Sequence, residues 1–230
     1  MSVDPEIMSQ FQLALFDFQG TSSQAFELFP KVWVATEALA DREVSSRHGG
    51  LDALEELNAA RYSPLVAYMI FTRIEDPDLS LRIKVINTLA KVLLPDEKGQ
   101  FAPEVVRQSL LSNLSQLRSG QITGILEAVE FDPDVEKNGA ILLKANCMAG
   151  NVMADILVDR KMPIGLRQQA ANMIARVGFV DAIPSIERLV TRLETRKNGQ
   201  QSYLYSQQEL GDEIALLPLL RSVLSILLAP

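Results

Sequence analysis

The chain holds few residues that could carry out catalysis, because it has one histidine and one cysteine. His48 is the single candidate base for a Ser-His or Cys-His relay. It stands beside two glycines, a pattern that predicts a solvated turn. Cys147 lies in an apolar stretch, where a free cysteine is usually a small buried hydrophobe. We therefore expect no catalytic residues and no enzymatic activity.

Metal and nucleotide sites are equally poorly represented. A single histidine excludes paired-histidine metal motifs, and neither a G-x(4)-G-K phosphate loop nor an H-E-x-x-H helix is present. One acidic run lacks the ligand spacing of a calcium loop and is explained more simply as the acidic start of a helix. It comprises Glu127, Glu130, Asp132, Asp134 and Glu136. We predict no cofactor and no metal ion.

The composition restricts the partners. The 22 basic and 29 acidic residues leave a net charge of -7, which repels phosphate backbones and disfavours nucleic acid. One cysteine cannot form an internal disulfide, so a reducing cytoplasm is expected. The most apolar segment, 214–230, is interrupted by Pro218 and Arg221 and is shorter than the roughly 20 residues of a membrane span. Asp4 and Glu6 precede the first apolar run, unlike a secretory signal.

Helices are the elements that must position every candidate residue. Apolar residues recur at helical spacing, as in Ile7, Phe11, Leu15 and Phe18, and no long stretch alternates with a period of two. Four places have a small or acidic residue followed by proline and then an acid, a pattern that predicts a helix start in which an aspartate before the proline caps the first turn. They are Asp4-Pro5-Glu6, Asp76-Pro77-Asp78, Ala102-Pro103-Glu104 and Asp132-Pro133-Asp134. Helices are predicted near 4–18, 22–40, 44–58, 63–75, 78–93, 103–118, 121–130, 134–146, 150–159, 163–177, 182–197 and 207–228.

The same series of six residue types, a proline, two acids, an arginine and two aliphatic residues, occurs twice in the chain and supplies the landmarks of a repeat. The copies are separated by 34 residues at the first landmark and by 35 at the other five. Self-similarity at this period indicates helix pairs that stack into a solenoid. The first copy is Pro30, Asp41, Glu43, Arg47, Leu51 and Leu54, and the second is Pro64, Asp76, Asp78, Arg82, Ile86 and Leu89.

These residues resemble HEAT repeats, a family of stacked helical hairpins. The stretch from Ser63 to Leu89 has the family's apolar first helix, its turn aspartate at Asp76 and its second-helix arginine at Arg82. A further partial copy contains Arg167. The resemblance implies an all-α fold, a right-handed α-solenoid of about five HEAT-like hairpins that forms one domain over 1–230. It also implies that the turn aspartates and helix arginines tie neighbouring repeats together.

We expect a non-enzymatic scaffold that binds a protein partner through the polar concave face of such a solenoid. Repeat offsets place two columns of polar residues on the second helices, opposite their apolar stripes. The columns are Asp52, Asn87 and Asn172, and Glu56, Lys91 and Arg176. Arg188, Arg192 and Arg196 recur every four residues on one helix face and form a basic ridge that could bind an acidic partner.

Two other functions stay open, a HEAT-fold DNA glycosylase and a lyase-type chaperone subunit similar to those that attach bilin pigments. The sole tryptophan, Trp33, is predicted to lie in the core and not to stack on bases. The C-terminal helix is apolar on nearly all sides and should be covered on both faces. Covering by its own chain and a homodimer contact are both compatible with that pattern.

Overall fold

The computed structural model describes residues 22–197 and 213–229, with side chains from Phe29 onward. Every regular element in these ranges is a helix and none is a strand, which confirms the all-α class. The chain divides into two compact units, 1–116 and 117–230, which are described separately below. The single HEAT-like domain over 1–230 stays a prediction.

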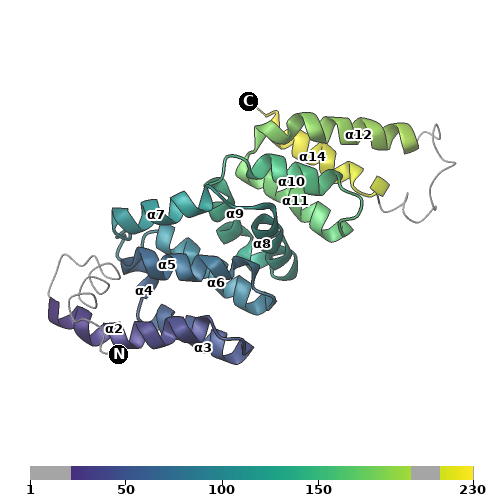
Figure 1. The fold of residues 1–230 in the computed structure, drawn as a ribbon. Coiled ribbons are helices and arrows are strands. Elements are labelled where there is room, and N and C mark those ends of the chain that lie inside the picture. The colour runs from purple at the N-terminus through teal and green to yellow at the C-terminus, as the bar shows by residue number, and fades with distance from the viewer. Residues whose placement is uncertain (1–21, 198–212, 230) are drawn as a thin grey trace. The chain divides into compact units, whose positions relative to one another are not determined.

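The first unit is built from two helical hairpins, the further helix α7 and two four-residue helical segments, α4 and η1. Helix α2 pairs with α3, and α5 pairs with α6. First helices also contact each other (α2 with α5), as do second helices (α3 with α6), and α7 packs on α5 (Figure 1). The elements are α2 (Ser22–Leu39), α3 (Val44–Glu56), α4 (Ala59–Tyr62), α5 (Pro64–Phe71), η1 (Thr72–Glu75), α6 (Leu79–Leu93) and α7 (Glu104–Leu114).

Local chemistry explains where the second hairpin begins and turns. The Ser63 side chain accepts a hydrogen bond from the Val66 N–H, and Pro64 occupies the first turn of α5, where no N–H is needed. At the start of α6 the predicted capping residue, Asp76, was wrong by two positions. Asp78 caps α6, and Asp76 and Pro77 lie before the helix. Asp76 is consequently available for a contact with the preceding hairpin.

The second unit also consists of packed helices. Helix α10 contacts α8 and α12, while α11 contacts α8, α9 and α14, and α12 contacts α14. Gly178 ends α11 with φ 84°, a left-handed value that glycine adopts without strain. A helix end at this glycine was predicted from the sequence. The elements are α8 (Ser119–Phe131), η2 (Pro133–Val135), α9 (Glu136–Lys144), α10 (Ala149–Val158), α11 (Ile164–Val177), η3 (Val180–Ala182), α12 (Ile183–Lys197) and α14 (Leu217–Leu227).

The predicted helices agree with the described elements to within a few residues, apart from the unpredicted α4. The helix predicted over 4–18 lies outside the described residues, as do positions 207–212 of the last one. A turn at 215–216 separates α14 from the residues before it. Within the described residues α14 buries one face, through Leu217, Leu220 and Val223, while Ile226 and Leu228 are exposed. The described residues therefore cover one of the two faces that were expected to be covered.

A buried ionic cluster joins Glu213, which precedes α14, to α11 and α12 of the second unit. Glu213 Oε2 lies 2.7 Å from Arg196 Nη1, and its other oxygen lies 3.2 Å from Arg167 Nη2. Arg167 also donates from Nε to the Leu157 carbonyl at 2.8 Å. Arg167 thus has a structural role of the kind that the HEAT resemblance implies. Over the two ranges that the structure describes, no helix has the length and apolar character needed to cross a bilayer.

Candidate interaction surface

Polar side chains link α3 to α6 in three successive contacts, which we call the α3–α6 ladder. The first joins His48 Nε2 to Asp78 Oδ1 at 3.0 Å. The second joins Asp52 Oδ1 to Lys84 Nζ at 2.7 Å. In the third, Glu55 Oε1 accepts from Thr88 Oγ1 at 2.7 Å and from Lys91 Nζ at 3.1 Å. Because α3 and α6 are the second helices of consecutive hairpins, the ladder fixes one hairpin on the next.

A buried ion pair reinforces the same junction. Arg47 Nη2 lies 2.8 Å from Asp76 Oδ1, and both side chains are almost fully buried, with 6% and 1% exposed. Arg47 Nη1 also donates to the Arg42 carbonyl at 2.8 Å, and Asp76 Oδ1 accepts from the Asp78 N–H at 3.0 Å. The HEAT resemblance implied this kind of link between a second-helix arginine and the turn aspartate of the next repeat.

His48, Asp78 and Ser80 come together, but not as a catalytic triad. Ser80 Oγ lies 3.2 Å from His48 Nε2, the same nitrogen that contacts Asp78 Oδ1. An ionised carboxylate only accepts hydrogen bonds, so this nitrogen carries the proton and cannot take one from Ser80. In a working triad the carboxylate holds the opposite nitrogen. The prediction of a turn histidine was also wrong, because His48 lies inside α3 and is partly buried.

The Asp78 carboxylate is instead the cap of α6. It accepts hydrogen bonds from Ser80 Oγ at 2.7 Å and from the Leu81 N–H at 2.8 Å. These bonds, with that from His48, lower the pKa of the Asp78 carboxyl from its ordinary 3.8 to about 2. A capping role accounts for the whole cluster.

Two substitutions of Asp78 distinguish the contribution of its capping oxygen to stability from that of its charge. Asp78→Ala should lower the free energy of unfolding by about 0.5–2 kcal/mol at neutral pH, because the first turn of α6 loses its acceptor. Asp78→Asn keeps a capping oxygen and should lose less. Urea unfolding followed by the fluorescence of Trp33, the sole tryptophan, measures both. Equal losses for the two variants would contradict the capping role.

Asp78 should also make the free energy of unfolding of the first unit fall at acid pH. The pKa of Asp78 is lower in the folded chain than its ordinary value, so its contribution is complete above about pH 4 and is lost as the pH falls through about 2. In Asp78→Asn this part of the loss should disappear, while other carboxylates continue to titrate. Urea unfolding curves of the native chain and of Asp78→Asn, recorded at several pH values between 5 and 2, compare how their free energies of unfolding fall with pH. Identical acid dependence would show that Asp78 contributes nothing to it.

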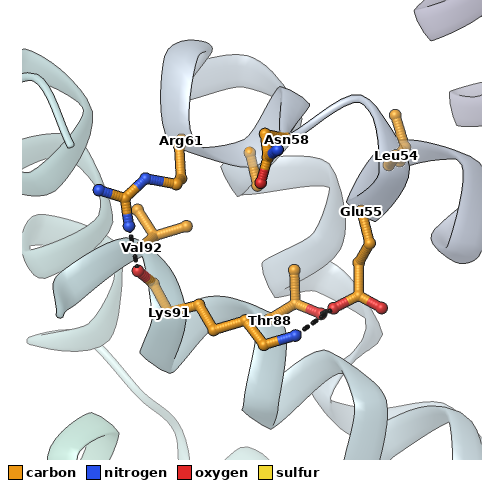
Figure 2. Close-up of a pocket in the computed structure, with 8 residues that line it drawn as sticks. Leu54, Glu55, Asn58, Arg61, Thr88, Lys91 and Val92 are labelled. Atoms are coloured by element: carbon orange, nitrogen blue, oxygen red, sulfur yellow. Dashed lines mark hydrogen bonds and ion pairs between the residues drawn. The ribbon is translucent and has the colours of Figure 1, made fainter. Parts of the chain in front are cut away.

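A small cavity of about 60 Å³, lined by both polar and apolar side chains, lies beside the ladder and is too small for a cofactor. Figure 2 shows Glu55 and Lys91 pointing toward one another across it, with Arg61 on the far side. Arg61 donates to the Lys91 carbonyl at 2.8 Å and to the Gln100 carbonyl at 2.7 Å. Arg61 therefore holds the end of α6 and the turn that follows it against α4.

The first-unit residues predicted to bind a partner share one polar face, but their pairing differs from the repeat columns. Asp52, Glu56 and Lys91 are exposed, and Asn87 is partly exposed. Lys91 bonds Glu55 and not its column neighbour Glu56. Glu56 stands at the edge of a groove between α3 and α2. Repeat offsets align equivalent positions of successive helices, whereas the helical rotation decides which carboxylate meets which lysine.

In the second unit the predicted residues lie on two helices. Asn172 and Arg176 are on α11, and Arg176 Nη1 lies 3.3 Å from Glu136 Oε1. Arg188 and Arg192 lie on α12 beside a hollow of about 380 Å³ that also contains Asp155. The third arginine of the expected ridge, Arg196, is buried against Glu213 and is not part of the surface.

Two further sequence interpretations are wrong. Cys147 is exposed, in the turn between α9 and α10, where Asn146 is the buried neighbour. Trp33 is 50% exposed on α2, where it stacks on Phe29 and donates to Glu37 at 2.8 Å. Within 22–197 and 213–229, no three histidine, cysteine or acidic side chains are grouped so that they could hold a metal ion.

An apolar groove of about 680 Å³ lies between α2 and α3 and was not predicted from the sequence. Its α2 side includes Pro30, Val34 and Ala38, and its α3 side includes Gly49 and Ala53. Small residues on α3 leave it open, since no heavy atom of the described structure lies within 4 Å of a Cβ placed on Gly49. The glycine pair inside a helix-forming pattern was the available signal, and it was interpreted as a turn.

No family model, curated protein or solved structure matches this chain. The HEAT resemblance therefore continues to depend on the repeated landmarks and the contacts given above.

Proposed function

We propose that this chain is a HEAT-like scaffold that binds a protein partner through the polar face of its second helices. The first unit supplies the supporting geometry. First helices contact first helices, second helices contact second helices, and Arg47 joins the turn aspartate of the following hairpin. This is the layering and the link expected of HEAT-like hairpins, about five of which would form a right-handed solenoid over the chain.

The observation that carries the proposal is the α3–α6 ladder. It holds charged groups of both signs at the surface, with the Lys91 side chain 69% exposed and Asp52 half exposed. A fixed, mixed-sign face favours recognition by complementary charges and hydrogen bonds, which give specificity and fast association. Because the groups are already held in place, a partner would lose little additional side-chain entropy on ordering them.

The same face argues against the DNA glycosylase alternative. On α3 and α6, Asp52, Glu55 and Glu56 offset the charges of Lys84 and Lys91, whereas a duplex requires a basic lining. Binding to duplex DNA that weakens steeply with salt would favour that alternative over ours. For the lyase-type chaperone subunit, no described residue selects pigment attachment.

Charge reversal on the face is the direct test. Lys91→Glu, on α6 of the first unit, should weaken capture of a protein partner from lysate of the source cells by about tenfold or more, because it places repulsion where attraction is proposed. Arg176→Glu, on α11, tests the second unit separately in the same assay. Lys144→Glu, an exposed lysine at the end of α9, is the matched control and should leave capture unchanged. Circular dichroism should show that all variants keep the native helix content. Undiminished capture by Lys91→Glu would remove the face of the first unit from the binding site, and undiminished capture by Arg176→Glu would remove Arg176 from it.

A further inference from the structure

The hollow between α10 and α12 in the second unit has a volume of about 380 Å³, which is in the size range of small-molecule sites. One wall is the face of α10 that carries Asp155 and Val158, which lie three residues apart and therefore on the same side of the helix. The other wall is one face of α12, which carries Ser185, Arg188, Leu189 and Arg192. Both walls thus belong to well-formed helices that pack on each other.

Arg188 is held in position by its own helix. Its Nε donates to the Pro184 carbonyl at 3.0 Å, and its Nη2 lies 3.3 Å from the Ser185 hydroxyl. Neither contact neutralises the guanidinium, and within 22–197 and 213–229 no carboxylate forms an ion pair with it. Its Nη1 group is consequently available to a carboxylate, the group that the planar arginine fork binds with the greatest geometric specificity.

Asp155 carries the opposite charge on the facing wall. It is exposed and forms no ion pair with any residue that the structure describes. Because two hydrogen bonds hold the Arg188 guanidinium on α12, the two charges line one hollow without neutralising each other. Arg192 adds a second positive charge to the α12 wall. A doubly charged anion such as phosphate is disfavoured by Asp155, whereas a ligand with one charge of each sign is complementary to both walls.

The remaining lining is apolar. Leu189 is 2% exposed, and Val158 on the opposite wall is partly buried. We propose that the hollow between α10 and α12 binds a free α-amino acid with an aliphatic side chain. The carboxylate of this ligand lies against Arg188, its ammonium group lies against Asp155, and its side chain packs on Leu189 and Val158. This inference does not depend on the partner-binding face.

Titration of the full chain with L-leucine, followed by the NMR shifts of its backbone amides, tests this site. The shifts should saturate and should be confined to α10, α12 and their immediate neighbours. N-acetyl-leucine lacks the ammonium group and leucinamide lacks the carboxylate, so each should bind about tenfold or more weakly than leucine. Inorganic phosphate should cause no saturable shift in these helices, because Asp155 repels it.

Two substitutions assign the two charges. Arg188→Gln and Asp155→Asn should each weaken leucine binding by about tenfold or more, because each removes the partner of one charged group. Lys144→Gln, an exposed lysine of the same unit on α9, is the matched control and should leave binding unchanged.

Several results would overturn the proposal. They are the absence of saturable shifts with leucine, equal binding of leucine and its two blocked analogues, and binding that survives both Arg188→Gln and Asp155→Asn. Saturable binding of phosphate would make the hollow a simple anion site. Tighter binding of the blocked dipeptide acetyl-Glu-Lys-amide than of leucine would assign it to a protein segment. Either of these last two results would likewise overturn the proposal.

Discussion

Asp76→Ala is expected to lower the free energy of unfolding of the first unit by about 3–5 kcal/mol, because it leaves the buried Arg47 guanidinium without its carboxylate. The loss should also include the hydrogen bond from the Asp78 N–H, which positions the start of α6. Urea unfolding followed by Trp33 fluorescence measures the effect, since Trp33 lies on α2 of the same unit.

Asp41 provides a matched control within the same repeat pattern. It stands 35 residues earlier and accepts the same type of backbone bond, from the Glu43 N–H at 2.9 Å, but it is exposed. Asp41→Ala should therefore cost no more than about 1 kcal/mol. A similar loss for both variants would show that burial of the ion pair is not what makes Asp76 important. Replacing Arg47 and Asp76 together with apolar residues should recover much of the loss.

Gly50→Ala is expected to destabilise the first hairpin by about 1–3 kcal/mol, because α2 and α3 touch at this glycine. A Cβ there would lie 2.5 Å from the Leu39 nitrogen and 2.6 Å from the Ala35 carbonyl oxygen. Both atoms belong to the α2 backbone, so no side-chain rotation can relieve the clash and the helices must separate. Urea unfolding with Trp33 emission, or amide exchange in α2 and α3, would detect the change.

The neighbouring glycine should respond in the opposite direction. Gly49 is exposed and faces open space, and alanine is favoured over glycine inside a helix by about 1 kcal/mol. Gly49→Ala should therefore leave stability unchanged or raise it by up to that amount. If the two substitutions had equal effects, the close approach of α2 and α3 at Gly50 would not be a determinant of stability.

Features determined by local sequence were predicted well. Helical periodicity and the glycine at 178 placed the helices, because spacing and backbone conformation are properties of short segments. The HEAT resemblance implied that turn aspartates and helix arginines tie neighbouring repeats together, but the particular pair of Arg47 and Asp76 was not predicted, because the two residues are 29 positions apart and the repeat offset relates only equivalent positions.

Features that depend on helix rotation and approach were not predicted. Whether Glu55 or Glu56 meets Lys91 is decided by a 100° difference in direction around α3, which a column of aligned positions does not resolve. Gly49 and Gly50 were assigned to a turn because glycine is common there, yet Gly50 lies in a helix for the close contact it allows. Trp33 and Cys147 were assigned to the interior from residue type alone, and both are exposed.

The α3–α6 ladder also limits how the length of the chain can vary. Its contacts join residues that are 30, 32, 33 and 36 positions apart, and all of them span the same connection through α4, α5 and η1. Inserting or deleting a residue within those helices would rotate α5 or displace α6, so every rung would lose its partner at once. The chain between Glu56 and Leu79 is thus a spacer of fixed length, in which substitutions are tolerated far more readily than insertions or deletions.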